Sequence, residues 1–347
     1  MKNLIFIIVF NINALIAFSQ TRNLLDYLPV NCVKDGTVDY TYYIQKSLNE
    51  NQTVLFPNFP LLVNDQGLRL RSGQDIIFQD RSKLILKSSK KGRYSLIHIV
   101  GVNNITLRNV RIEGDRYSHI GSAGEWGMGI EIKDSKNVTI LSPEISKFWG
   151  DGIYITGRNT NNVLVNGGII KNNRRNGVSI ISGSNIRLKG ILIQDTKNGV
   201  HPMSAIDIEP NSFEKDYLGK ITLEDITSRN NLRGVSIVLS NYLSENPSLI
   251  DITVSGFRSS GDEVGIKVNP FSSKKIRSKK VAQLKGQVLF ENIEMKNVNR
   301  DPVMVIGKNE DYTLAPNFVF RNISIDSKIN LSNKFKGFNT RKFSLSK

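Results

Sequence analysis

Two short templates alternate along the middle of the chain, and this alternation constrains the fold more than any other feature. The first is Gly or Ala followed by aliphatic-x-aliphatic. Its copies are GIEI at 129, GIYI at 152, GVSI at 177, AIDI at 205, GVSI at 234, GIKV at 265 and a weaker VMVI at 303. Short strands with period-two alternation that recur at the intervals between these positions are typical of solenoid coils. We therefore predict an all-β chain that forms a right-handed parallel β-helix.

The second template is polar-aliphatic-x-aliphatic-x followed by Asn, Gly, Asp or Ser, and it falls between successive copies of the first. Its sixth position is Asn109, Ser142, Gly167, Gly190, Asp225, Gly256, Asn292 and Asn322. These residues tolerate the left-handed backbone conformation, so we predict a sharp bend at each. Asn104, Asn137 and Asn322 also lie in Asn-x-Ser/Thr sequons. We interpret them as coil-turn residues, because each belongs to a copy of this template.

A short helix is expected to cap the first coil, within residues 33 to 60, because Tyr43, Ile44 and Leu48 can form one apolar face. Here the chain resembles the pectate-lyase-like superfamily of right-handed parallel β-helices, which includes pectate lyases and polygalacturonase-like proteins. Its members often begin with Asp-Gly-x-x-Asp-x-Thr-x-x-Ile-Gln followed by Phe-Pro. The matching residues are Asp35, Gly36, Asp39, Thr41, Ile44, Gln45 and Phe56-Pro57. The resemblance covers roughly residues 33 to 330 and implies the fold, whereas activities differ across the superfamily.

The ends of the chain suggest an exported protein. Residues 1–19 have one Lys, an apolar stretch and small residues before position 20, which favours a cleavable signal peptide and a secreted or periplasmic location. Residues 20–330 are expected to form a single β-helix domain that includes the cap, and residues 331–347 a basic polar tail. No later run is long enough to span a bilayer. Cys32 is the only cysteine, so no intramolecular disulfide can form.

The chain is strongly basic, with a formal net charge of +16. Export disfavours nucleic acid as the partner, which leaves an acidic polysaccharide, an anionic cell surface or solubility alone as the reason for the charge. Of these, we take an acidic polysaccharide as the expected partner.

We place the binding groove on the sheet formed by the first template. Its aliphatic residues point inward, so the residues between them form an outward column: Glu131, Tyr154, Ser179, Asp207, Ser236 and Lys267. Neighbouring coils are about 4.8 Å apart, so these polar side chains lie within reach of one another. The outward positions of the second template show no such chemical variety.

The family resemblance singles out Asp151. Polygalacturonase-like glycosidases carry a catalytic Asp directly before one Gly-Ile-Asp-Ile strand and an Asp-Asp pair before the next. WGDGIYI matches the first element at Asp151, but Arg175 and Asn176 occupy the places of the pair, and Ser204 replaces a family His, with His201 nearby. The family mechanism therefore does not transfer intact.

Asp207 and Glu209 can take the vacant catalytic roles. They are two residues apart on one strand, so they face the same side, roughly 6.6 to 7 Å apart along the backbone. This is close to the lower end of the carboxylate separation for inverting glycoside hydrolysis, about 6.5 to 9.5 Å. Asp151 lies two coils away, at about 10 Å. Alternatively, both acids are solvated strand residues paired with Arg175 and Arg233.

Further residues near this face are candidates for substrate binding. Trp126 and Trp149 would lie on neighbouring coils, where they either stack on sugar rings or pack as a ladder that secures the turn. The other candidates are Glu131, Tyr154, Arg174, Arg175, His201, Arg233 and Lys267. An insertion between residues 113 and 126 can form a groove wall.

We interpret the chain as an exported enzyme that cleaves glycosidic bonds of an acidic polysaccharide, with Asp151, Asp207 and Glu209 as its catalytic acids and no metal site or required cofactor. A polysaccharide lyase or uronate epimerase is the first alternative, in which Arg or His chemistry neutralises a uronate and Ca²⁺ is a possible cofactor. A non-catalytic glycan-binding surface protein is the second. The oligomeric state stays open.

Overall fold

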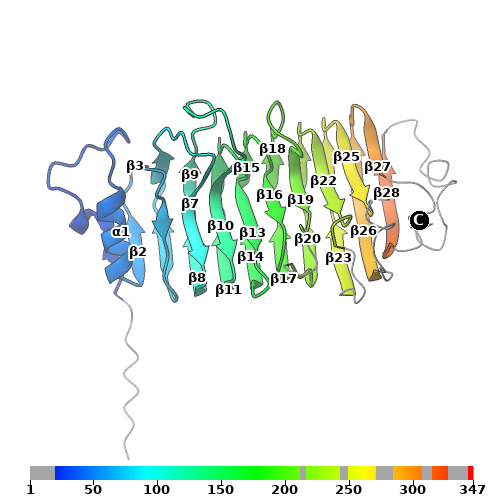
Figure 1. The fold of residues 1–347 in the computed structure, drawn as a ribbon, viewed down its shortest axis with the longest axis horizontal. Coiled ribbons are helices and arrows are strands. Elements are labelled where there is room, and N and C mark those ends of the chain that lie inside the picture. The colour runs from blue at the N-terminus through cyan, green and yellow to red at the C-terminus, as the bar shows by residue number, and fades with distance from the viewer. Residues whose placement is uncertain are drawn as a thin grey trace, which may run out of the picture.

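The computed structural model describes residues 20–211, 216–242, 249–270, 284–306, 315–326 and 343–346. The expected signal peptide, residues 1–19, and most of the expected tail lie outside the described residues. The described chain winds into an elongated stack of coils (Figure 1). The strands lie across the long axis of the molecule and follow one another along it (Figure 1). This is the predicted right-handed parallel β-helix.

One row of strands, here called sheet B, contains every copy of the first template. Its strands all pair in parallel. They are β4 (Leu68–Arg69), β7 (Arg93–Val100), β10 (Trp126–Lys133), β13 (Ile153–Thr156), β16 (Val178–Ile180), β19 (Ser204–Ile208), β22 (Arg233–Val238), β25 (Val264–Asn269) and β27 (Asp301–Val305). The copy on β7 carries Leu96 in place of the template Gly, so the template search missed it.

The second template forms another row of parallel strands. It comprises β1 (Arg22–Asn23), β2 (Thr53–Phe56), β5 (Asp75–Phe78), β8 (Asn103–Arg108), β11 (Lys136–Leu141), β14 (Asn161–Asn166), β17 (Ser184–Lys189), β20 (Lys220–Glu224), β23 (Leu249–Ser255), β26 (Lys285–Lys296), β28 (Asn317–Ile325) and β29 (Phe343–Ser346). The last of these strands lies within the expected tail and pairs in parallel with β28.

A third row was not predicted. It comprises β3 (Pro60–Val63), β6 (Lys83–Leu86), β9 (Arg111–Glu113), β12 (Glu144–Ser146), β15 (Ile169–Lys171), β18 (Leu192–Gln194), β21 (Thr227–Arg229) and β24 (Arg258–Ser260), and it continues through the last residues of β26 and β28. Most of these strands have three residues, with a single inward side chain at the centre. Such a strand has no alternating pattern for sequence analysis to detect.

The predicted bends between the second and third rows are confirmed. Every residue at the sixth template position has a positive φ, between 48° at Ser142 and 72° at Gly167. The sequon asparagines have the same conformation and form a ladder: Asn137 Nδ2 donates to Asn104 Oδ1 and Asn162 Nδ2 donates to Asn137 Oδ1, both at 2.8 Å. They are therefore coil-turn residues, as we interpreted them.

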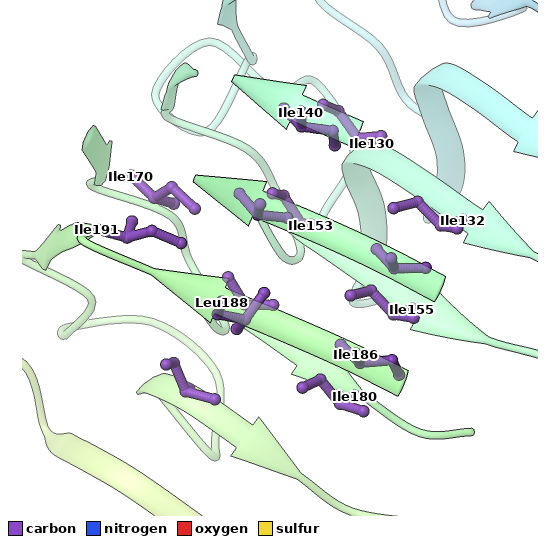
Figure 2. Packing of buried hydrophobic residues seen from close by; sticks show 14 of the residues in the cluster. Ile130, Ile132, Ile140, Ile153, Ile155, Ile170, Ile180, Ile186, Leu188 and Ile191 are labelled. Atoms are coloured by element: carbon purple, nitrogen blue, oxygen red, sulfur yellow. The ribbon is translucent and has the colours of Figure 1, made fainter. Parts of the chain in front are cut away.

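Aliphatic side chains stack in register inside the cylinder (Figure 2). Ile130, Ile153, Val178, Ile206, Val235 and Ile266 pair from strand to strand along sheet B and are completely buried. The register that stacks these residues inside also fixes which residues face outward, because successive side chains alternate between the two faces of a strand.

The predicted cap is helix α1 (Thr41–Glu50), preceded by the 3-10 turn η1 (Leu24–Tyr27). Ile44 and Leu48 are buried and Tyr43 packs partly against the core, as expected. Gln45 fixes α1 to β4: its Nε2 donates to the Arg69 carbonyl oxygen and its Oε1 accepts from the Arg69 amide, at 3.0 and 2.8 Å. The Gln of the amino-terminal motif thus joins the cap to sheet B.

The asparagine ladder can be tested by substitution at Asn137. Both Asn137→Gly and Asn137→Ala remove the two ladder bonds, but only Ala also places a Cβ in the left-handed region, at φ 57°. We expect the Ala variant to be less stable than the Gly variant by about 1 kcal/mol in urea unfolding. Equal stability, or a less stable Gly variant, would contradict this account of the turn.

Candidate functional site

The strand register assembles the predicted outward column on sheet B. Glu131, Tyr154, Ser179, Asp207, Ser236 and Lys267 are successive register partners. His98 of β7 continues the column before Glu131. Acids, bases and hydroxyls therefore line one face along many coils.

Asp151, which the family resemblance singled out as a catalytic acid, is not exposed on the outward face. Its side chain is completely buried. Its Oδ1 accepts from the Asn176 amide at 3.0 Å, and its Oδ2 accepts from Ser179 Oγ at 2.7 Å and from Arg175 Nη1 at 2.8 Å. Burial raises the pKa of Asp151, whereas Arg175, Ser179 and the Asn176 amide favour the charged form. Three donors from the protein therefore occupy its two oxygens.

A second buried aspartate shows that this arrangement is a structural device of the coil. Asp262 Oδ1 accepts from the Asn231 amide at 2.7 Å, and its Oδ2 accepts from Ser228 and Ser259, both at 2.6 Å. The same arrangement thus occurs twice: one Asp oxygen accepts from the backbone amide of an Asn, and the other accepts from a Ser hydroxyl. We conclude that Asp151 secures the turn that enters sheet B.

Asp207 is buried in a different environment: in the described part of the chain its carboxyl group accepts from no backbone amide and no arginine, and its side-chain neighbours are Glu209 and the Ser236 hydroxyl. Burial raises the pKa of Asp207, the negative charge of Glu209 raises it further, and Arg175 opposes both, so that the pKa reaches about 8. Asp207 therefore holds a proton at neutral pH. It is not a solvated strand residue.

Buried polar atoms for which the described residues supply no clear hydrogen-bond partner occur on Asp207's strand and on the next one. They are Ser204 Oγ on β19 and Arg233 Nε on β22, beside the Asp207 carboxyl group and its neighbour Ser236. A buried polar atom without a partner costs about 1–3 kcal/mol. Such atoms are unusual in a purely structural sheet.

Glu209 and three cations surround this cluster. Glu209 follows β19 and is half-buried. The charges of Arg233 and Lys267 interact with Asp207 and Glu209, while burial lowers the pKa of both cations. Arg175 interacts with Asp151 most strongly and then with Asp207. The structure thus brings together the two acids and the three cations that the sequence placed near this face.

The two tryptophans lie on neighbouring coils, as expected, because the Gly150 amide donates to the Gly127 carbonyl at 2.7 Å. Trp149, however, cannot stack on a sugar in this arrangement. His119 stacks on its ring at a centroid distance of 4.0 Å, and Arg174 lies 3.6 Å from the same centroid. Arg174 is thereby held in packing as well. Trp126 is 44% exposed and keeps an available ring.

The insertion after residue 113 is tied down by Asp115. Its carboxylate accepts from Tyr94 Oη and the Ser89 amide, and it contacts His119 Nδ1 at 2.7 Å. The insertion is therefore fixed beside Trp149. His201 is exposed in the loop that leads into β19.

Sequence analysis missed His98 and Ser95, which share one partner with a predicted residue. Ser95 Oγ donates to Glu131 Oε2 at 3.1 Å, and His98 Nδ1 lies 3.3 Å from the same oxygen. These contacts hold the pKa of Glu131 below its usual value despite its burial, and the contact with His98 has the largest effect. The missed signal was LIHIV, an aliphatic-x-aliphatic run one coil before Glu131.

These residues line a cavity of about 970 Å³ between α1 and the first strands of sheet B. Among the described residues, no three His, Cys, Asp or Glu side chains are grouped to hold a metal ion. The described part of the chain also contains no helix long and apolar enough to cross a membrane.

Comparison with known proteins supports the fold. Residues 61–213 match the family described as the right handed beta helix region. The uncharacterized protein YclG of Bacillus subtilis is 28% identical over 246 residues, or 60% of this chain, and the match spans 42% of the relative's length. The chain thus spans less than half of that curated relative.

Two solved structures share the architecture. The polygalacturonase from Erwinia carotovora ssp. carotovora aligns with a TM-score of 0.59 and 15% identity, over 91% of this chain and 96% of the enzyme. The tailspike gp49 of Acinetobacter baumannii bacteriophage Fri1, a capsular polysaccharide depolymerase, aligns with a TM-score of 0.62 and 11% identity, over 94% and 62%. At such identities, the likeness establishes the fold.

The protonated state of Asp207 makes stability depend on pH. The unfolded chain releases this proton near the ordinary value of 3.8, whereas the folded protein keeps it to about 8. Stability therefore falls as pH rises between these values. Asp207→Asn removes this loss, so we expect the variant to gain stability relative to wild type between pH 5 and pH 8 in urea unfolding. Asp80→Asn, at an exposed loop position, is the control. A difference between Asp207→Asn and wild type that does not change with pH would refute the raised pKa.

Proposed function

We propose that this chain, which has the right-handed parallel β-helix fold of the pectate-lyase-like superfamily, is an exported enzyme that cleaves glycosidic bonds of an acidic polysaccharide. The site is the cluster around Asp207 on the outward face of sheet B. The polygalacturonase and the phage depolymerase support this proposal by showing that the fold serves polysaccharide chemistry in other proteins.

The observation that carries the proposal is the completely buried Asp207 beside a second carboxyl group, Glu209. In the buried aspartates with a structural role, Asp151 and Asp262, a backbone amide donates to one oxygen and Ser or Arg side chains donate to the other. Among the described residues Asp207 has no such amide or Arg donor, its neighbour is another acid, and it holds a proton. A protonated carboxyl near pH 7 is the state that a general acid requires.

The reaction needs two carboxyl groups in different states. Asp207 donates its proton to the leaving glycosidic oxygen as the bond from that oxygen to the anomeric carbon breaks. Glu209, which is more exposed, takes a proton from a water molecule whose oxygen attacks that carbon from the opposite face. Because the Asp207 and Glu209 carboxyl groups contact each other in the free protein, they must separate as the sugar and the water enter between them. Because Asp207 has no exposed surface, a long side chain beside it must move when substrate binds.

The cations beside the acids favour an acidic substrate. Arg233 and Lys267 lie close enough to Asp207 and Glu209 to interact electrostatically with both. A uronate carboxylate on the substrate would interact favourably with these two cations. This supports the expectation that the basic chain acts on an acidic glycan.

The same cations support a second candidate, a polysaccharide lyase or uronate epimerase. Both reactions remove the proton beside a uronate carboxylate, and neutralising that carboxylate by Arg175, Arg233 or Lys267 makes the proton more acidic. The unpartnered Arg233 Nε is the observation in favour. Of the two proposed functions, only the lyase or epimerase reaction would use Ca²⁺ as a cofactor.

The proposal is tested with purified protein and a panel of polyuronates and sulfated glycans. We expect new reducing ends without ultraviolet absorbance, and a loss of about 100-fold or more in kcat for Asp207→Asn and for Glu209→Gln. Glu224→Gln on β20, outside sheet B, is the matched control and should keep wild-type activity.

Other outcomes would replace the proposal. Unsaturated, absorbing ends would identify a lyase, and a change in uronate stereochemistry without cleavage would identify an epimerase. Binding without any turnover would identify a glycan-binding protein. Full activity in both acid variants would show that the site lies elsewhere.

A further inference from the structure

A second open feature of the described sheet B surface lies away from Asp207. It is the cavity of about 970 Å³ between α1, the loop 64–67 and strands β4, β7 and β10. Gly67 allows this loop to approach β7, because a Cβ there would lie 2.0 Å from the Ser95 carbonyl oxygen. Glu131 belongs both to the cavity and to the outward column, three register steps from Asp207, or roughly 14 Å.

The acidic residues of the cavity are already engaged by donors from the protein. Asp39 accepts from the Thr41 amide and hydroxyl and from Asn64 Nδ2. Asp65 accepts from Ser89 Oγ and Lys91 Nζ, both at 2.6 Å. Glu131 is held by Ser95 and His98. The three carboxylates therefore have limited capacity left for a ligand.

Two arginines in the lining, by contrast, leave their charged groups available to a ligand. Arg69 and Arg93 are exposed, and their guanidinium groups make no ion pair and no hydrogen bond with the described residues. The formal charges of the lining cancel between Asp39, Asp65, Glu131 and Lys91, Arg69, Arg93. However, the acids are satisfied internally, so the unused hydrogen-bonding groups are those of the guanidiniums. A guanidinium pairs best with a planar anion such as a carboxylate, or with a sulfate.

Exposed aromatic rings accompany these arginines. Tyr42 lines the cavity and is 72% exposed. Trp126 is the register partner of Arg93 on β10 and is 44% exposed. Aromatic rings with one apolar face and nearby hydrogen-bonding groups suit the apolar face of a sugar ring. Arg69 is the register partner of His98, five residues along β7 from Arg93, so the two arginines contribute two separate positions of one cavity lining. Guanidiniums next to such rings are suited to an acidic sugar.

We propose that this cavity, through Arg69 and Arg93, binds a carboxylated or sulfated sugar unit of the same polysaccharide chain that reaches Asp207. The assignment to one polysaccharide rests on the proposed function. The anionic sugar binds at the amino-terminal end of the column, several sugar units from the bond that breaks. Its affinity is therefore separable from catalysis at Asp207 and Glu209.

Binding is measured by calorimetry in the Asp207→Asn background, so that turnover does not interfere. The probes are an oligogalacturonate, a sulfated oligosaccharide and a neutral galacto-oligosaccharide of the same length. We expect the acidic probes to bind more tightly than the neutral one, and Arg69→Gln and Arg93→Gln each to weaken acidic binding about tenfold. Arg187→Gln on β17, outside sheet B, is the matched control and should leave affinity unchanged.

The preferred acidic probe distinguishes a carboxylate from a sulfate ligand. Equal affinity for the neutral probe, no binding of either acidic probe, or unchanged affinity in the Arg69→Gln/Arg93→Gln double variant would overturn the subsite. These results do not bear on turnover, which is measured in the wild-type background. If the arginine variants lose affinity while Asp207→Asn keeps full activity, the subsite stands and the catalytic assignment fails.

Discussion

The in-register stacking of inward aliphatic side chains is the constraint on which the rest of the structure depends. Each coil buries residues such as Ile130, Ile153 and Ile206 against the same positions of its neighbours. A slip of one residue would turn these side chains outward, so the register is strongly fixed. Outward residues are consequently held in columns, and their chemistry can vary from coil to coil without changing the fold.

Buried polar groups on this scaffold fall into two kinds. Asp151 and Asp262 have their oxygens satisfied by an Asn amide and Ser hydroxyls, and they secure turns. Asp207 has no amide or arginine donor among the described residues, and burial beside Glu209 raises its pKa and keeps it neutral. Since burying two neighbouring carboxyl groups is costly, this arrangement favours a functional explanation. The separate cavity, in which Arg69 and Arg93 make no ion pair with the described residues, extends the same face towards the cap.

Most of the fold could be predicted from the sequence because its determinants are local. The alternating residues around Ile153 and the bend residues such as Asn109 and Gly167 carry the pattern themselves. The third row escaped detection, since strands such as Arg111–Glu113 bury one side chain each. The β7 strand escaped because Leu96 replaces the template Gly.

The candidate site could be predicted only in part. The register placed Asp207 and Glu209 correctly on the outward face, but their pattern could not reveal that Asp207 is completely buried. The role of Asp151 depends on Ser179 and Arg175, which lie on the next coil. The sandwich around Trp149 depends on His119 from a distant insertion. Such contacts between coils are not encoded in any local pattern.

The most direct test of the central claim is a crystal structure of the Asp207→Asn variant with a bound acidic oligosaccharide. The account predicts a glycosidic oxygen within hydrogen-bonding distance of residue 207, with Glu209 facing the anomeric carbon from the other side. An oligosaccharide bound along another face, or on sheet B without contact to residues 207 and 209, would contradict it.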